Sequence, residues 1–230
     1  MPSTFAFPPP ATPSLRILGS EARFPVRRIY CVGQNYAAHA REMGGDPDRT
    51  PPFFFSKPGD ALVPGGGKIP YPSKTANFHH EVELVVALER GGMNIDAKEA
   101  LEHVFGYAVG IDLTRRDLQN DAREKKQPWD ASKGFDRSAP CGTLHPVSEV
   151  DHLSSGAIWF KVNGEMRQSS DISDLIWSVP NIIAFLSQLF ELAPGDLIYT
   201  GTPAGVGPLQ RGDHGEGGIE RLGTIAIDIV

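Results

Sequence analysis

The stretch "NFHHEVELVVAL", residues 77–88, decides the fold. From Val82 onward it has the apolar run of a buried strand. Two acids, Glu81 and Glu83, stand at its head. Side chains alternate along a strand, so these two carboxylates point to the same side. Two like charges at the edge of a core are costly unless something neutralises them, and the remaining sequence has to supply that partner.

The composition is that of an ordinary globular protein. The chain has 230 residues, 40% of them hydrophobic and 22% charged, and a formal net charge of −6 that argues against nucleic acid as a partner. No apolar run approaches the roughly 18 residues that span a bilayer, and the start is not a signal peptide, so we expect no membrane association. The two cysteines, Cys31 and Cys141, lack CxxC spacing, which favours the reducing cytoplasm.

Turn residues divide the chain into short elements, because 25 Gly and 20 Pro favour strands over a helical bundle. Residues 1–26 are Pro-rich and predict an N-terminal arm or irregular segment, followed by a single catalytic domain over 27–230. Asn163 and Gly164 are the turn of a predicted hairpin over 154–170. We expect strands within 27–33, 51–58, 81–89, 104–114, 194–207 and 224–230, helices at 35–45, 96–104 and 178–192, and partial helix over 115–127.

Strands therefore outnumber helices and do not alternate with them regularly. This pattern predicts an α+β fold with a large sheet system that is mixed or mostly antiparallel. Asn35 is a candidate N-cap for the helix at 35–45, and Gly44-Gly45 a candidate stop.

A third acid, Asp112, ends the apolar run "YAVGIDLT". Three carboxylates at strand ends predict a hard, all-oxygen site for Mg²⁺, or equally for Mn²⁺ or Ca²⁺. Taken alone, Glu81 and Glu83 are as typical of a solvated strand end as of a metal site. The neighbouring histidines, 79 and 80, do not indicate zinc, since there are no Cys ligands and no HExxH motif.

His39 and Glu42 are three residues apart on a predicted helix, so they share a face. A carboxylate beside an imidazole raises its basicity, as a general base acting on water requires, although most such pairs are ordinary surface pairs. Lys133 in "SKGFDRS" and Arg116 in "DLTRRDLQ" become candidate clamps for an anionic substrate if they lie near a metal.

The glycine-rich "TGTPAGVG" lets the backbone approach a ligand, and Thr202 offers a hydroxyl, but the loop matches neither nucleotide motif. GxSxG is absent, so a hydrolase would use activated water rather than a covalent intermediate.

Seven segments in this order resemble the fumarylacetoacetate hydrolase family from about residue 27 to the C-terminus. They are "YCVGQNYAAHAREMG", "FFFSKP", "HHEVELVV", "GIDLTRRDLQ", "WDASKGFDRSAP", "VNGEMRQ" and "LIYTGTPAGVG". Each is weakly specific alone, and the combination of ExE, a downstream Asp, KGFD and TGTPxGVG is highly specific. The length, the "HAREMG" helix and the double His resemble the family's acylpyruvate hydrolases, above all its fumarylpyruvate hydrolases.

The resemblance implies a mixed β-sandwich roll with a few short helices, as a homodimer. It implies Mg²⁺ or Mn²⁺ at Glu81, Glu83 and Asp112, a mobile lid carrying a His39–Glu42 dyad, and a catalytic Lys133. It also implies that the substrate pocket is lined by Lys57, Arg116, Gln119 and Thr202.

The implied reaction is hydrolysis of a carbon–carbon bond in a small anionic 2,4-dioxo acid, fumarylpyruvate giving fumarate and pyruvate in gentisate-type aromatic degradation. The alternative is an oxaloacetate or unsaturated-dioate decarboxylase or isomerase, and a carboxylate-binding protein without activity is a third reading. One departure is Gln34, where the family often has Arg. For a second carboxylate on the substrate, the candidate partners are Arg115, Arg137 and Lys57.

Overall fold

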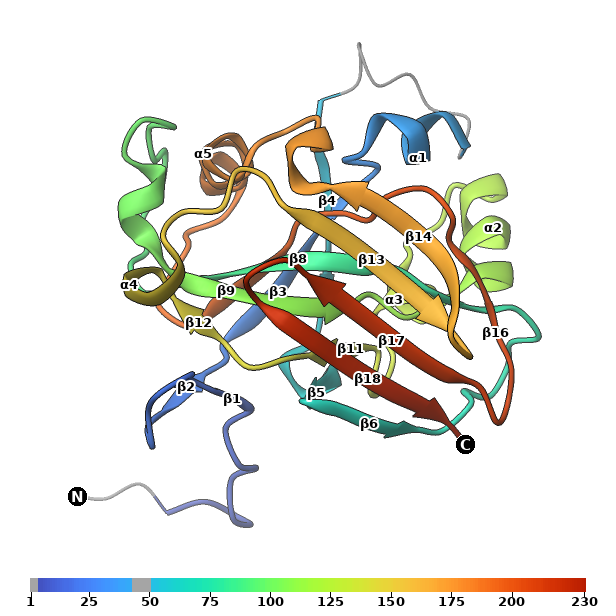
Figure 1. Ribbon diagram of the computed structural model, residues 1–230. Coiled ribbons are helices and arrows are strands. Elements are labelled where there is room, and N and C mark those ends of the chain that lie inside the picture. Colours follow the sequence, from blue (N-terminus) through green and yellow to red (C-terminus); the bar gives the residue numbers. More distant parts are fainter. Residues whose placement is uncertain (1–3, 43–50) are drawn as a thin grey trace.

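The computed structural model describes residues 4–42 and 51–230 of the chain, and strands make up most of it (Figure 1). The helices are α1 (Ala37–Glu42), α2 (Arg116–Glu124), α3 (Asp130–Lys133), α4 (Val147–Val150) and α5 (Val179–Leu189), with 3₁₀ turns at η1 (Gly59–Ala61), η2 (Ala100–His103) and η3 (Ile172–Asp174). The strands are β1 (Ser14–Arg16), β2 (Arg23–Pro25), β3 (Arg28–Gly33), β4 (Phe53–Lys57), β5 (Leu62–Pro64), β6 (Gly66–Ile69), β7 (Phe78–His80), β8 (Val82–Leu88), β9 (Val104–Ile111), β10 (Thr114–Arg115), β11 (Ala139–Cys141), β12 (His145–Pro146), β13 (Ala157–Val162), β14 (Glu165–Asp171), β15 (Asp196–Tyr199), β16 (Gly207–Leu209), β17 (His214–Ile219) and β18 (Gly223–Ile229).

Two mixed sheets form the body of the fold. The larger runs β4-β3-β15-β8-β9-β11-β5, with β12 also paired to β9, and the smaller runs β14-β13-β17-β18-β6. Figure 1 shows the smaller sheet lying across the larger one, with α5 and α2 at opposite sides. Both sheets contain parallel and antiparallel pairs, for β15 pairs parallel with β3 and antiparallel with β8. The predicted α+β fold with mixed sheets and few short helices is confirmed.

Strand β8 is buried on both faces because each face meets a different hydrophobic core. Val82, Leu84 and Val86 point into the main core between the two sheets, and Val85 and Ala87 point into a second core on the opposite face. Glu81 and Glu83 have the parity of the second set, since side chains alternate. The two carboxylates therefore enter the protein on the face away from the sandwich core.

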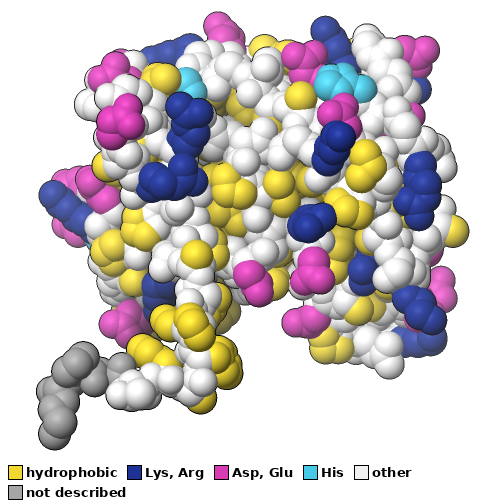
Figure 2. Space-filling view, turned by 90° about the horizontal axis from the view of Figure 1, so that it is seen from below, with side chains coloured by type: hydrophobic (Ala, Val, Ile, Leu, Met, Phe, Trp, Pro, Cys, Tyr) yellow, Lys and Arg dark blue, Asp and Glu magenta, His cyan; other side chains and the backbone are white. Residues whose placement is uncertain are grey.

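The segment before residue 27 contains the short hairpin of β1 and β2, so it is not only an arm. Leu15 and Phe24 from this hairpin belong to the second core, and Arg27 forms an ion pair with the buried Asp196 at 3.1 Å. Preceding residues are exposed, Phe5 and Phe7 among them, and Figure 2 shows hydrophobic side chains gathered next to the grey N-terminal end. Part of this segment thus covers the face of the large sheet that carries the acids.

Most predicted elements occur where expected, and one helix does not. Asn163 and Gly164, at φ 53° and 83°, make the turn between β13 and β14. The helix predicted over 96–104 is wrong, because that segment consists of turns ending in η2. Hydrogen bonds hold both ends of the segment. The Asp96 carboxylate accepts from the Lys98 amide, and the His103 carbonyl accepts from the Glu89 amide. None of the described helices has the length and apolarity needed to cross a membrane.

The two-core arrangement predicts a large cost for truncating Leu84. Leu84→Ala removes a fully buried side chain from the main core and should lower the free energy of unfolding by about 2–5 kcal/mol in urea denaturation. Leu189→Ala, at an exposed position of α5, is the matched control and should change it by less than about 0.5 kcal/mol. Equal effects of the two substitutions would contradict the assignment of β8 to the centre of the core.

Candidate metal centre and active site

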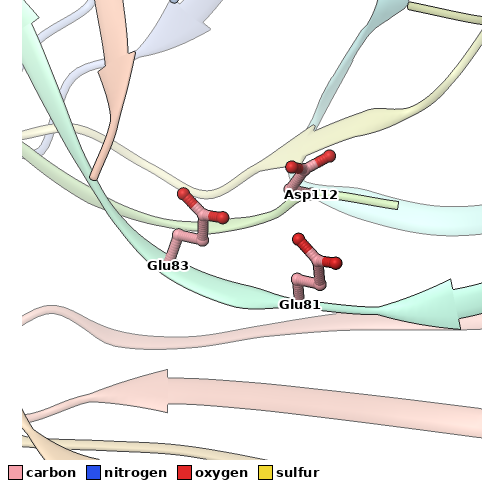
Figure 3. A group of neighbouring side chains, drawn as sticks. All are labelled: Glu81, Glu83 and Asp112. Atoms are coloured by element: carbon pink, nitrogen blue, oxygen red, sulfur yellow. The ribbon is translucent and has the colours of Figure 1, made fainter. Parts of the chain in front are cut away.

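Three buried carboxylates, Glu81, Glu83 and Asp112, converge at one end of the β8–β9 pair. Antiparallel pairing puts Glu83 opposite Gly110, and continuing this register by two residues brings Glu81 beside Asp112. The Asp112 amide donates to the Glu81 carbonyl at 2.8 Å, and this bond extends the pairing of the two strands beyond their last paired residues. Figure 3 shows the carboxylates pointing toward one another, and one oxygen of each lies within 4.8 Å of the others.

Two buried lysines neutralise Asp112 from different sides. Lys133, the last residue of α3, donates from Nζ to Glu81 Oε2, Asp112 Oδ2 and Thr114 Oγ1, each at 2.7 Å. Lys57, the last residue of β4, forms an ion pair with Asp112 Oδ1 at 2.7 Å and donates to the Leu113 carbonyl at 3.1 Å and to the Lys133 carbonyl. Burial opposes the charge of Lys133, but Asp112 and Glu81 outweigh it and raise the pKa of Lys133.

Arg116 supplies a third cation from the first turn of α2. Its Nη2 pairs with Glu81 Oε1 and its Nη1 donates to Gln119 Oε1, so the guanidinium is held between two acceptors. Burial favours neutral Glu81, yet the charges of Lys133 and Arg116 outweigh it and hold the pKa of Glu81 well below its usual value. Glu81 is therefore ionised at neutral pH.

Glu83 has a different environment, since the described residues offer its carboxylate no ion pair. It accepts from the Gly201 amide at 2.7 Å. Burial, and then the charges of Asp112 and Glu81, raise the pKa of Glu83 well above its usual value. Gly201 has φ 99°, and a Cβ there would lie 2.7 Å from Asn35 Cβ, so the amide can reach Glu83 only because residue 201 has no side chain.

This donor set fits a divalent metal ion such as Mg²⁺ or Mn²⁺. All three groups are carboxylates, which hard cations prefer, and all three are buried with oxygens close enough to share one ion. The repulsion that raises the pKa of Glu83 is the feature that a divalent cation would relieve.

His39 reaches the same cavity from α1. The cavity is lined by His39 together with Glu81, Glu83, Arg116, Gln119, Lys133 and Thr202, all of which the sequence had singled out. His39 also contributes to lowering the pKa of Glu81, so its ring lies near that carboxylate. Glu42 ends α1, but its side chain lies outside what the structure describes, as do Gly44 and Gly45.

Asn35 positions the start of α1 by a route the sequence did not predict. It is not an N-cap: its Nδ2 donates to the Trp177 and Thr200 carbonyls at 3.0 and 2.8 Å, and its Oδ1 accepts from the Trp177 amide at 2.7 Å. Asn35 thus ties the α1 segment to two loops of the core. The role of its buried amide depends on the positions of those loops, which the local sequence does not give.

Of two expected pocket residues, Thr202 lines the cavity and Lys57 does not. Lys57 is fully buried behind Asp112 and is absent from the cavity lining, so it holds a carboxylate in place. Thr202 does line the cavity, and its hydroxyl donates to the Val82 carbonyl at 2.8 Å.

The two histidines lie outside the carboxylate group. Burial, assisted by Arg116, lowers the pKa of His79 to about 4, and its ring is hydrogen-bonded to Asn77 at 2.8 Å. Burial also lowers the pKa of His80 to about 4, and its ring stacks on Phe160 at 4.4 Å. Both are neutral at pH 7 and serve packing and positioning.

Gln168 is a positioning residue that sequence reasoning missed. Its Oε1 bonds to His80 and accepts from the Val82 amide at 3.1 Å, and its Nε2 donates to Thr202 Oγ1 and the Pro203 carbonyl at 2.8 Å. It therefore joins β14 to the head of β8 and to the glycine-rich loop. The only signal was its place at the end of the segment "VNGEMRQ", to which no role was assigned.

The metal assignment predicts that Glu83→Gln abolishes tight Mn²⁺ binding. The amide keeps the shape and the acceptor for Gly201 but loses the negative charge, so affinity should fall on the order of 100-fold or more in isothermal titration calorimetry. Glu89→Gln, at the exposed residue after β8, should leave the affinity unchanged. Unaltered Mn²⁺ affinity in Glu83→Gln would remove Glu83 from the ligand set.

A structural role for Lys57 predicts a loss of stability rather than of substrate affinity. Lys57→Met leaves Asp112 and two carbonyls with fewer partners, which should cost about 3 kcal/mol of unfolding free energy in urea. Lys68→Met, at an exposed position of β6, should cost less than about 0.5 kcal/mol. A stable Lys57→Met protein with weakened substrate binding would favour the pocket role instead.

Known proteins resemble this chain over nearly its whole length. Residues 28–230 match the model of the fumarylacetoacetate hydrolase C-terminal family. A crystal structure of fumarylpyruvate hydrolase from Pseudomonas aeruginosa in complex with Mn²⁺ and pyruvate superposes with a TM-score of 0.97 at 54% identity, covering 99% of each chain. The fumarylpyruvate hydrolase of a Ralstonia species is 44% identical over 77% of this chain and 92% of its own length.

A relative with another activity is also similar. The mitochondrial oxaloacetate decarboxylase of Dictyostelium discoideum is 39% identical over 89% of this chain and 94% of its own length. The family match over 28–230 and these identities agree with the mixed sheets and the buried acids. The chain therefore belongs to the fumarylacetoacetate hydrolase family.

Proposed function

We propose that this protein is a metal-dependent acylpyruvate hydrolase, with fumarylpyruvate as the expected substrate. It is an enzyme of a family that acts on carbon–carbon bonds of ketonic substrates. The observation that carries the proposal is the position of His39 in the wall of the cavity that contains Glu81 and Glu83. Hydrolysis needs a base for water beside the proposed metal ligands, whereas decarboxylation does not.

The charges of the site suit an anionic dioxo acid. The three carboxylates are matched in number by Lys57, Lys133 and Arg116, so a divalent ion leaves an excess of positive charge for the substrate. We assign Glu81, Glu83 and Asp112 as the metal ligands and Mg²⁺ or Mn²⁺ as the ion. When bound, the ion supplies Lewis acidity toward the pyruvoyl end.

The protein groups then divide the remaining chemistry. His39, with Glu42 as its proposed partner, takes a proton from water, whose oxygen forms a bond to the distal carbonyl carbon. Lys133 and Arg116 lie in the same cavity and place positive charge beside the oxyanion that forms, and the Gln119 amide nitrogen offers it an N–H donor. The bond between this carbon and the pyruvate methylene breaks, and its electron pair stays on the pyruvate enolate. Protonation of the enolate yields pyruvate beside the carboxylic acid, and Thr202 helps to orient the substrate.

A second candidate is oxaloacetate decarboxylation, favoured by the Dictyostelium relative. It uses the same acids and the same enolate but no attacking water. The relatives named fumarylpyruvate hydrolase, one of them at 54% identity, support the hydrolase.

The biological setting is part of the proposal. We place the enzyme in the cytoplasm, in the breakdown of aromatic compounds, as a homodimer. The buried free cysteines, Cys31 and Cys141, fit a reducing compartment. Light scattering of the purified chain tests the dimer.

His39 is the sharpest test of the reaction type. His39→Ala should lower pyruvate release from fumarylpyruvate by roughly 10²–10⁴-fold, in an assay coupled to lactate dehydrogenase, because the general base is lost. Binding of Mn²⁺ and of oxalate, a pyruvate-enolate analogue, should persist in calorimetry.

The control and the competing substrate complete this test. Arg41→Ala, at an exposed position of the same helix, should retain activity. Near wild-type turnover by His39→Ala would refute water activation by this residue. A wild-type preference for oxaloacetate over every acylpyruvate would refute the hydrolase assignment.

A further inference from the structure

The cavity beside the carboxylates is too small for a whole dioxo acid. Its volume is about 20 Å³, close to what a single water molecule requires. The acyl part of an acylpyruvate contains several heavy atoms beyond the two oxygens of its metal-binding end. That part must lie in a space that adjoins this cavity.

One larger groove adjoins it directly. It has a volume of about 450 Å³ and shares Phe53, Phe55, Trp129 and Lys133 with the cavity of the carboxylates. Since four residues line both spaces, the groove continues outward from the site. Two other cavities, one beside Val179 and Leu175 and one beside Asn120 and Glu124, share none of their described lining residues with the cavity of the carboxylates.

The shared wall is aromatic and is held rigidly. The Trp129 ring packs edge-on to Phe53 at 5.4 Å between centroids and also contacts Phe55 at 5.7 Å. Phe53 lies over Gly33, where a Cβ would be 2.0 Å from its ring, and Lys133 Nζ lies 5.1 Å from the centre of the Phe55 ring. The three rings are only half-buried, so they present apolar faces to a ligand.

In the described part of the chain, the lining of the groove offers a second carboxylate no lysine or arginine outside the ion pairs of the acids. Among the described residues that line the two spaces, the Lys and Arg side chains are Lys133 and Arg116, and both are already paired with the acids. The groove adds Asp130, which is acidic, and the cavity adds Gln34, which is neutral.

The cations expected at this end lie elsewhere. Arg115 stacks on Phe135 at 4.4 Å and donates to the Ala131 carbonyl, and Lys57 is buried against Asp112. Neither they nor Arg137 line the cavity or the groove.

We propose that the groove along Phe53, Phe55 and Trp129 is the acyl subsite, and that it selects flat, conjugated or aromatic acyl groups by ring contact. A distal carboxylate on the acyl group contributes little to binding. This inference rests on the proposed acylpyruvate chemistry, and it widens the substrate class to aroylpyruvates, whose acyl group carries no charge.

Calorimetry on the Mn²⁺-loaded His39→Ala protein tests the subsite without consuming the ligand. The ligands differ in their acyl group. It is short in acetylpyruvate, flat and charged in fumarylpyruvate, and flat and uncharged in benzoylpyruvate. Benzoylpyruvate should bind within about tenfold of fumarylpyruvate. Adding Trp129→Ala should weaken both about tenfold, or about 1.4 kcal/mol, and acetylpyruvate by less than about threefold.

Two further variants separate ring contact from structural damage. Trp129→Phe should recover most of the affinity, because it keeps an aromatic ring at this position. Trp159→Ala, on β13 of the other sheet, should leave all three affinities unchanged.

Two results would overturn the subsite. One is equal weakening of all three ligands by Trp129→Ala, which would indicate a general effect through the Trp129 carbonyl, the acceptor for the Lys133 amide. The other is fumarylpyruvate binding more than 100-fold tighter than benzoylpyruvate, which would indicate recognition of the charge. The proposed function is judged separately, by pyruvate release from these compounds in the wild-type enzyme.

Discussion

The structure depends on the burial of three carboxylates in one place. Glu81, Glu83 and Asp112 are almost inaccessible to solvent, and an isolated buried charge is too costly to persist. The surrounding chain is arranged to meet that cost. Lysines arrive from the ends of β4 and α3 and an arginine from the start of α2, so three separate elements converge on the head of one strand.

These ion pairs also prepare the site for chemistry. Lys133 contacts two of the acids as well as Thr114, and Arg116 is fixed between Glu81 and Gln119. Side chains held in this way need little rearrangement to present donors to a developing negative charge. Glu83, with its raised pKa, forms no ion pair with the described residues, and the charge of Lys133 only partly offsets its burial and the repulsion of Asp112 and Glu81. The site thus combines paired cations with a repulsion among carboxylates that a divalent metal ion would relieve.

The double burial of β8 explains why the site can exist inside the protein. One face of the strand packs in the sandwich core, and the other face is covered by the second core, to which the N-terminal hairpin contributes Leu15 and Phe24. The acids stand at the end of that second face, where α1 and the glycine-rich loop close over them. The cavity beside the acids adjoins the groove along Phe53, Phe55 and Trp129, so one strand end would serve both the proposed metal ligands and the proposed acyl subsite.

The sequence by itself determined the local features: the buried run after Val82, the same-side placement of Glu81 and Glu83, the Asn163-Gly164 hairpin, and the acid that ends β9. Each depends on alternation or turn chemistry within a few residues. It also identified most of the residues that line the cavity, through motifs in a fixed order.

Only the tertiary structure decided which of these residues meet, and how. Lys57 is predicted as a substrate contact, but it forms an ion pair with Asp112. Asn35 is predicted as a helix cap, but it joins two loops. In both cases the partner is far away in the chain. Gln168, Phe53, Phe55 and Trp129 lie in segments that resemble the family, but their roles could not be inferred locally for the same reason. The segment at 96–104 forms turns rather than an α-helix, and its hydrogen bonds go to Glu89, just after β8, and to residues within the turn. Periodicity predicts the face of a strand or helix on which a side chain lies. The partner that neutralises a buried charge depends on the packing of segments that are distant in the chain.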